Sequence, residues 1–234
     1  MRITLPPRLK AIAEAVTKNT TAADIGTDHG YLPVYLIKQV GLEKVIATDV
    51  NEDPLSKARR IINRHGLRKQ VELRQGDGLR VLAAGEAETI IIAGMGGALI
   101  GELLQASPEV AQRADRLILQ PVQSVPELRR YLLISGYRII AEKLIQEKFR
   151  FYEMIIARYE ALPPMQPDPL LLQIGAFIRY QEPATAQAYL QRKIRLLERK
   201  RQGLLKAEVK DTAFIEETTR LIRVLKEELA WFLR

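Results

Sequence analysis

The chain has 234 residues, of which 47% are hydrophobic and 27% charged, with no cysteine, two histidines and a formal net charge of +8. This length fits one large domain, or one domain with an appendage. The lack of cysteine excludes disulfides, thiolate metal sites and cysteine nucleophiles, and we expect no metal centre. No apolar stretch is long enough to span a bilayer, and residues 1–10 lack the apolar core of a signal peptide, so a cytoplasmic location and no membrane partner are expected.

The first 160 residues alternate between strand-like and helix-like segments. Strands are expected at 21–25, 44–49, 71–75, 89–93 and 115–120, and helices at 9–16, 31–40, 54–65, 97–107 and 125–135. Two further strands, 137–146 and 149–159, then follow each other with no helix between them. The predicted fold class is therefore α/β, with a Rossmann-like parallel sheet and an antiparallel last strand.

A change in composition marks the C-terminal part of the chain. Residues 162–169, LPPMQPDP, contain four prolines, which preclude a helix and favour a stiff linker. Segments 170–180, 184–209 and 211–233 are helix-like, and the two longer ones predict an antiparallel coiled-coil hairpin. The expected domains are a catalytic domain at 1–161, the linker at 162–169 and a basic helical domain at 170–234.

Positive charge is concentrated in the helical domain. Residues 1–161 hold 23 Lys and Arg against 19 Asp and Glu, whereas residues 170–234 hold 13 against 8. One predicted helix carries a basic cluster of Arg192, Lys193, Arg195, Arg199, Lys200 and Arg201. This distribution is compatible with a polyanionic partner such as RNA, and the alternative is an ordinary solvated helix surface.

Acids and glycines follow the first two predicted strands. The first strand and its turn contain Asp24, Gly26, Asp28, His29 and Gly30. The second strand ends in Asp49. In a doubly wound sheet this pattern holds a nucleoside, because glycines let the backbone approach the ligand and the acid accepts hydrogen bonds from ribose hydroxyls. Asp24 and Asp28 would repel a pyrophosphate but attract a sulfonium cation, by roughly 4 kcal/mol per pair of charges 4 Å apart. The alternative is an ordinary β-turn.

Glycines also follow the third and fourth predicted strands. GDG at 76–78 ends the third strand, and AGMGG at 93–97 follows the fourth. The glycines of AGMGG permit close approach of a flat group and leave amides free at a helix start. The alternative is a glycine-rich turn with Met95 in the core.

These motifs together resemble the TrmK-like bacterial tRNA (adenine-N1)-methyltransferases, which are class I S-adenosylmethionine-dependent methyltransferases that modify adenine 22. The matching segments are LPPRL at 5–9, ADIGTDHGYLP at 23–33, ATDVNEDPL at 47–55, GDGL at 76–79, AGMGG at 93–97 and LQP at 119–121. The resemblance implies a Rossmann-like methyltransferase domain, S-adenosylmethionine as methyl donor, tRNA as substrate and a C-terminal coiled coil that helps to hold tRNA.

The resemblance also implies which residues bind the cofactor. They are Asp24, Gly26, Thr27, Gly30, Asp49, Val50, Asp77, Gly78, Ala93 and Gly94. Asp49 would accept from the ribose hydroxyls, and Asp77 from the adenine amine with Gly78 and Leu79 lining the ring, although Asp77 is equally plausible as a helix N-cap. Asp53 is expected to be the N-cap before Pro54.

The candidate catalytic residues are Asp28, His29 and Met95. AGMGG lacks the Asn/Asp-Pro-Pro-Tyr/Phe motif of many enzymes that methylate amino groups. Adenine N1 has an in-plane lone pair and can attack directly if it is held in line. Asp28 would then stabilise the positive charge on the adenine, and His29 would accept a proton or orient the base, unless it is only a turn residue. Tyr31 either stacks on the base or belongs to the core.

Two other functions remain open from the sequence. One is an S-adenosylmethionine-dependent methyltransferase that acts on another RNA or a small molecule, and the other is a non-catalytic binding protein. A monomer or a weak homodimer is expected.

Overall fold

The computed structural model describes residues 3–207 and 211–233 and divides the chain into two compact units, Met1–Gln166 and Pro167–Arg234. The boundary between the units falls within the proline-rich segment 162–169. The end of the helix expected at 184–209 lies outside the described residues.

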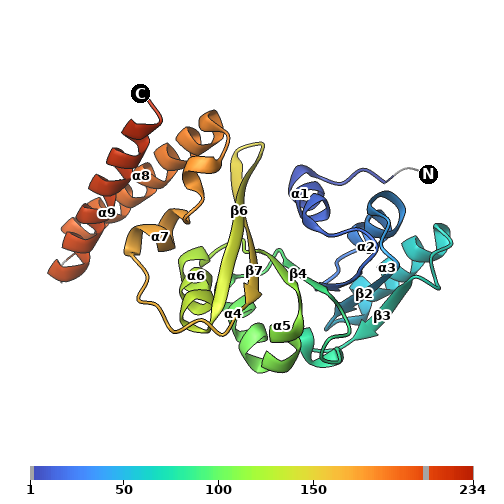
Figure 1. Cartoon of the computed structure of the whole chain (residues 1–234). Helices are drawn as coiled ribbons and strands as arrows, with labels where there is room; N and C mark the ends of the chain where they lie inside the picture. The colour runs from blue at the N-terminus through green and yellow to red at the C-terminus, as the bar shows by residue number, and fades with distance from the viewer. Residues whose placement is uncertain (1–2, 208–210, 234) are drawn as a thin grey trace. The chain divides into compact units, whose positions relative to one another are not determined.

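The first unit contains a seven-stranded sheet with the order β3-β2-β1-β4-β5-β7-β6 (Figure 1). Its strands are β1 (Thr21–Ile25), β2 (Lys44–Asp49), β3 (Val71–Gln75), β4 (Thr89–Ala93), β5 (Arg116–Gln120), β6 (Tyr137–Glu147) and β7 (Arg150–Tyr159). The first five strands are parallel, and β7 is antiparallel to both β5 and β6. The Rossmann-like sheet with an antiparallel last strand is therefore confirmed.

Helices cover both faces of this sheet. They are α1 (Pro7–Ala15), α2 (Tyr31–Tyr35), η1 (Leu36–Val40), α3 (Glu52–Arg64), η2 (Gly78–Val81), α4 (Gly97–Ala106), α5 (Pro108–Arg113) and α6 (Val125–Ile134). Successive residues of a strand point to opposite faces, so β4 feeds two cores. Ile91 packs with the core of α1, α2 and α3, whereas Ile90 and Ile92 pack with the core of α4, α5 and α6. A continuous apolar run such as TIIIA is typical of a strand buried on both faces.

Three local features differ from the expectations. The helix expected at 31–40 is an α-helix followed by a π-helical turn, which ends at Gly41 with φ +86°. Helix α5 is an element that the sequence pattern did not predict. The prediction of Asp53 as an N-cap was wrong, because α3 begins two residues earlier than expected with Asn51 at the N-cap, and Asp53 instead pairs with Lys57 at 2.7 Å.

The second unit consists of α7 (Pro169–Ile174), η3 (Ile178–Tyr180), α8 (Pro183–Lys206) and α9 (Thr212–Trp231). Gly175 separates the first two of these, which were expected as one helix. Helices α8 and α9 are antiparallel: Gln187 Nε2 near the start of α8 donates to the Phe232 carbonyl after α9 at 2.9 Å, while Lys200 near the end of α8 lies over the Phe214 ring. The helical hairpin is confirmed, and its packing as a coiled coil remains a prediction.

Candidate nucleoside site

The carboxyl ends of the parallel strands are tied into one continuous edge by backbone hydrogen bonds. The amide of Thr27 donates to the Thr48 carbonyl at 2.8 Å, and the amide of Gly76 donates to the Asp49 carbonyl at 3.0 Å. On the other side of β4, the amide of Gly94 donates to the Gln120 carbonyl at 3.0 Å. The strand order reverses between β1 and β4, which is where open α/β sheets bind ligands.

A cavity of about 260 Å³ opens at this edge. Its lining residues are Ile25, Gly26, Thr48, Asp49, Val50, Gly76, Asp77, Gly78, Met95, Leu99 and Leu103. Six of these were candidates from the sequence, namely Gly26, Asp49, Val50, Asp77, Gly78 and Met95. The others were missed; Leu99 and Leu103 belong to α4, where an apolar residue at helical spacing cannot be told from a core residue. Leu79 is buried in the core and does not line the cavity.

Two glycines of the first turn have different structural roles. Gly26 has φ +80°, and a Cβ there would overlap the methyl group of Met95, so the close approach of Met95 requires this glycine. Gly30 has φ +72°, and a Cβ there would lie 2.9 Å from the Cβ of Ala58 in α3. Gly30 therefore serves the packing of α3 against the turn and lies outside the cavity wall.

Three more predicted cofactor residues also lie outside the cavity wall, namely Thr27, Ala93 and Gly94. Thr27 is buried beneath the turn, and Ala93 is the last residue of β4. They shape the strand edge through their main chain, as the bonds of Thr27 and Gly94 show.

Both cavity acids have one carboxylate oxygen engaged by the protein. Asp49 Oδ1 accepts from the Asn51 amide at 2.9 Å, and Asp77 Oδ2 accepts from Arg80 Nη1 at 2.9 Å. Asp77 occupies the N-cap position of η2, as its alternative predicted, but its side chain makes no capping bond there. The second oxygen of each carboxylate can accept hydrogen bonds from a ligand.

Asp24, on β1, does not line the cavity. Only 6% of the residue is exposed. Burial raises its pKa most strongly, a hydrogen bond with Thr27 lowers it, and the nearby charge of Asp49 raises it, so that the pKa is about 6. A buried carboxyl beside a second acid is a site where a bound cation would be stabilised.

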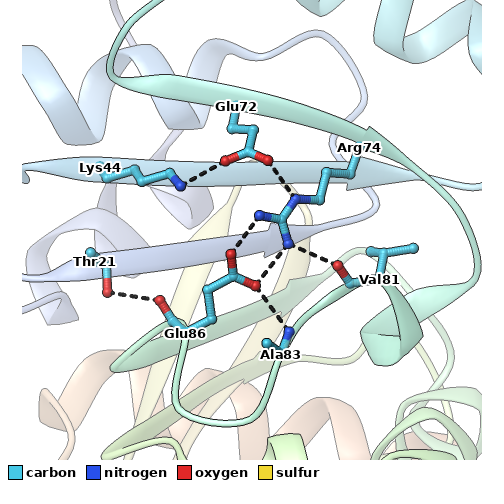
Figure 2. Close-up of polar contacts among 7 residues, drawn as sticks. All are labelled: Thr21, Lys44, Glu72, Arg74, Val81, Ala83 and Glu86. Atoms are coloured by element: carbon cyan, nitrogen blue, oxygen red, sulfur yellow. Dashed lines mark hydrogen bonds and ion pairs between the residues drawn. The ribbon is translucent and has the colours of Figure 1, made fainter.

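A polar network fixes the segment that carries Asp77 (Figure 2). Arg74 on β3 donates through Nη1 to the Val81 carbonyl at 2.8 Å and to Glu86 Oε2 at 2.7 Å, and Glu86 Oε2 also accepts from the Ala83 amide at 2.9 Å. The guanidinium of Arg74 lowers the pKa of Glu86 to about 2. The network thus holds both sides of the connection between β3 and β4, and sequence reasoning missed it because these contacts depend on how that connection folds back onto β3.

The remaining catalytic candidates lie on the exposed turn after β1. His29 Nδ1 is 2.8 Å from Asp28 Oδ2, and the Asp28 side chain is 81% exposed. The imidazole stacks on the Tyr31 ring, with the ring centroids 5.9 Å apart. Asp28 and His29 are absent from the cavity wall.

Some cations of the basic cluster on α8 contact their own unit, and others are exposed. Lys193 donates to the Gln173 carbonyl, and Lys200 lies 4.3 Å from the Phe214 ring centroid, so both cations turn toward their own unit. Arg195 and Arg199 are exposed. A second cavity, of about 690 Å³, lies in this unit between the start of α7 and one face of α9, but no strand end or glycine turn lines it.

Among residues 3–207 and 211–233, no cluster of histidine and acidic side chains could hold a metal ion. In the same residues, no helix combines the length and apolar character that crossing a membrane requires.

Comparison with known proteins agrees with this geometry. The family model for a methyltransferase domain matches residues 5–155. The chain belongs to the methyltransferase-domain family. That match includes every lining residue of the 260 Å³ cavity.

Individual relatives show which methyltransferases the chain resembles. The tRNA (adenine(22)-N(1))-methyltransferase of Bacillus subtilis is 39% identical over 153 residues, an alignment that spans 65% of this chain and 64% of that enzyme. The crystal structure of the B. subtilis m1A22 tRNA methyltransferase TrmK superposes with a TM-score of 0.86 and 28% identity, covering 97% of this chain and all of that one. A Streptococcus pneumoniae protein solved with S-adenosyl-L-methionine gives a TM-score of 0.83 and 27% identity over the same share of this chain. The resemblance to TrmK-like proteins is confirmed.

Proposed function

We propose that this protein transfers a methyl group from S-adenosylmethionine to N1 of adenine 22 in tRNA. The observation that carries the proposal is the cavity at the ends of β1 to β4, in which two carboxylates and three glycines surround a space for a nucleoside. The B. subtilis relative with this named activity and the S. pneumoniae structure with bound cofactor support it. A tRNA substrate implies a cytoplasmic location.

The residues of the cavity fit S-adenosylmethionine. We assign the free oxygen of Asp49 to the ribose hydroxyls and that of Asp77 to the adenine amine, while Val50 and Leu99 provide apolar walls for the ring. Asp24 and Asp49 supply negative charge below the turn at Gly26, where a sulfonium or ammonium group would lower the pKa of Asp24. When bound, the cofactor supplies an electrophilic methyl group on a positively charged sulfur.

The chain's own residues would then act mainly by positioning. The N1 lone pair of adenine forms the new N–C bond as the S–C bond breaks, and the positive charge passes to the base. Holding the reacting atoms in line can supply roughly 7–11 kcal/mol. The Asp28 carboxylate stabilises the charge that develops on the adenine, His29 orients the base, and Met95 packs beside Gly26 at the edge of the cavity.

The C-terminal unit is proposed as the tRNA-binding domain. Its exposed arginines on α8 can contact phosphates, and each contact should add roughly 0.7–0.9 to the salt slope of binding. The target base must leave its stack to reach the turn after β1, which costs a few kcal/mol that the tRNA contacts can offset.

The experiment is to incubate the protein with methyl-labelled S-adenosylmethionine and unmodified bacterial tRNA, and to identify the labelled nucleoside by mass spectrometry. N1-methyladenosine is the expected product. Label in another nucleoside, or none in tRNA despite cofactor binding, would contradict the proposal and favour another RNA or a small-molecule acceptor.

A further inference from the structure

A second group of polar side chains lies at the strand edge, on the far side of β4 from the cofactor cavity. Gln120 ends β5 and is fully buried, and its carbonyl accepts from the amide of Gly94 in the AGMGG segment. The guanidinium of Arg8, on α1, approaches the Gln120 side chain, with Nη1 3.5 Å from Oε1. The cofactor assignment makes no use of this group.

The β6–β7 hairpin completes the group. The guanidinium carbon of Arg8 lies 5.7 Å from the centroid of the Tyr152 ring of β7, and the Arg8 amide donates to Glu147 Oε2 of β6 at 3.4 Å. Three separate elements, α1, β5 and the hairpin, thus hold one half-buried arginine. Within the part of the chain that the structure describes, the Arg8 guanidinium forms no ion pair with a carboxylate, whereas Arg74 and Arg129 each pair with two.

The position of this cation restricts what it can bind. Gln120 faces the same core as α1 and α2, so Arg8 and the turn at Asp28 flank the AGMGG segment from the same side of the sheet. Methylation at N1 leaves the adenine positively charged, and a guanidinium against the base would oppose that charge. A phosphate of the RNA backbone is negatively charged and matches the donors of an arginine.

We propose that Arg8 binds a backbone phosphate at the target nucleotide and positions it for transfer, with Gln120 and Tyr152 fixing the guanidinium. This inference rests on the proposed function. Asp28 and Arg8 then contact different parts of the target nucleotide: Asp28 faces the base, and Arg8 faces the phosphate. Arg8 is a substrate-binding residue in this assignment, and Gln120 and Tyr152 are positioning residues.

The test uses full-length protein with three substitutions, Arg8→Met, Arg8→Lys and Arg116→Met. Methionine keeps much of the apolar stem, so the packing on Tyr152 is retained while the charge is lost. Arg116 is the matched control: it is also half-buried, and it lies at the opposite end of β5, where Nη1 donates to the Ala15 carbonyl. Binding of tRNA is measured by fluorescence anisotropy across a salt series, with S-adenosylhomocysteine present.

Arg8→Met should weaken tRNA binding by about tenfold and lower the salt slope by about 0.7–0.9, the change for one lost phosphate contact. Arg8→Lys should keep the slope, because it keeps the charge. Arg116→Met should leave the slope unchanged, and all three variants should bind S-adenosylmethionine like the wild type. An unchanged slope in Arg8→Met, or an equal loss in Arg8→Lys, would overturn the assignment and make Arg8 structural.

The same titrations separate this inference from the proposed function. A slope that falls in Arg8→Met while the wild type leaves tRNA unmethylated supports the phosphate contact and refutes the proposed reaction. A wild type that does not bind tRNA overturns both.

Discussion

The cofactor cavity and helix α8 use charge in opposite ways. In the cavity, Asp49 and Asp77 each have one oxygen fixed by a neighbouring donor, and Asp24 is buried close enough to Asp49 to feel its charge. On α8, Arg195 and Arg199 are exposed side chains on one long helix. A small cationic ligand requires a few oriented acids, whereas a polyanion can be held by several exposed cations. Loss of one group should therefore matter much more in the cavity than on the helix.

The largest effect is expected from Asp49→Ala. Hydrogen bonds to charged groups contribute about 1.5–3 kcal/mol each, so losing the acceptor of the ribose hydroxyls should weaken S-adenosylmethionine binding by about 100-fold. Isothermal titration calorimetry measures this directly. Asp53→Ala is the matched control, since Asp53 is an exposed acid nearby that pairs with Lys57 and should not affect affinity. Equal losses in the two variants would show that only general negative charge matters.

The second prediction is that replacing Asp24 raises the stability of the fold but weakens cofactor binding. Its folded pKa of about 6 exceeds the ordinary value of 3.8, so its contribution to stability is present below pH 3.8 and is lost as the pH rises through 6. At pH 7.5 the buried charge should cost about 2–3 kcal/mol. Asp24→Asn should therefore raise the free energy of unfolding by that order at pH 7.5 and much less at pH 4.5, while it weakens cofactor binding.

Urea titrations at the two pH values give the stability difference. A gain of equal size at both would mean that desolvation of a charged Asp24 is not its cause. Unchanged cofactor affinity would remove Asp24 from the binding site.

An intermediate effect is expected from the turn after β1. Asp28→Ala and His29→Ala should each lower the single-turnover rate on saturating tRNA by about 10- to 100-fold, because a charge stabiliser or an orienting group is lost. The Asp28 side chain is 81% exposed and the His29 side chain 41%, so the melting temperature should change little. Wild-type rates in both variants would refute their catalytic assignment.

The smallest effect is expected on the helix. Arg195→Gln combined with Arg199→Gln should weaken tRNA binding by about tenfold and reduce the salt slope by roughly 1.4–1.8, with no change in cofactor affinity. Arg220→Gln combined with Arg223→Gln on α9 is the control, because it removes two exposed arginines from the other helix of the hairpin. An equal loss in both pairs would show that the hairpin attracts RNA only by its overall charge.

The sequence predicted the sheet well and its helical connections less well. The bounds of β1, β2, β3 and β4 agree with the structure. β1, β2 and β4 contain apolar runs, β3 alternates apolar and polar residues over Val71–Arg74, and an acid or a glycine marks the end of each strand. Helix α5 follows Ser107 and Pro108, a pair that reads equally well as a loop or as a helix start. The break at Gly175 depends on its φ of +75°, which sequence spacing does not reveal.

The candidate site likewise contains residues that the sequence could place and residues that it could not. Asp49 and Asp77 could be placed in the cavity because the ends of parallel strands meet at one edge. The burial of Asp24 depends on packing between distant segments, and one of the two ion pairs of Arg74 depends on how the connection between β3 and β4 folds back. The position of the Arg8 guanidinium could not be predicted from the sequence either, because it depends on contacts with Gln120 and Tyr152, which lie more than a hundred positions away.

The central claim is that the protein methylates one adenine of tRNA, adenine 22. The most direct measurement compares methyl transfer to a tRNA transcript with transfer to the same transcript in which adenine 22 is replaced by guanine. The account predicts label in the first and its loss in the second, with similar affinity for both. Equal labelling of the two transcripts would contradict it.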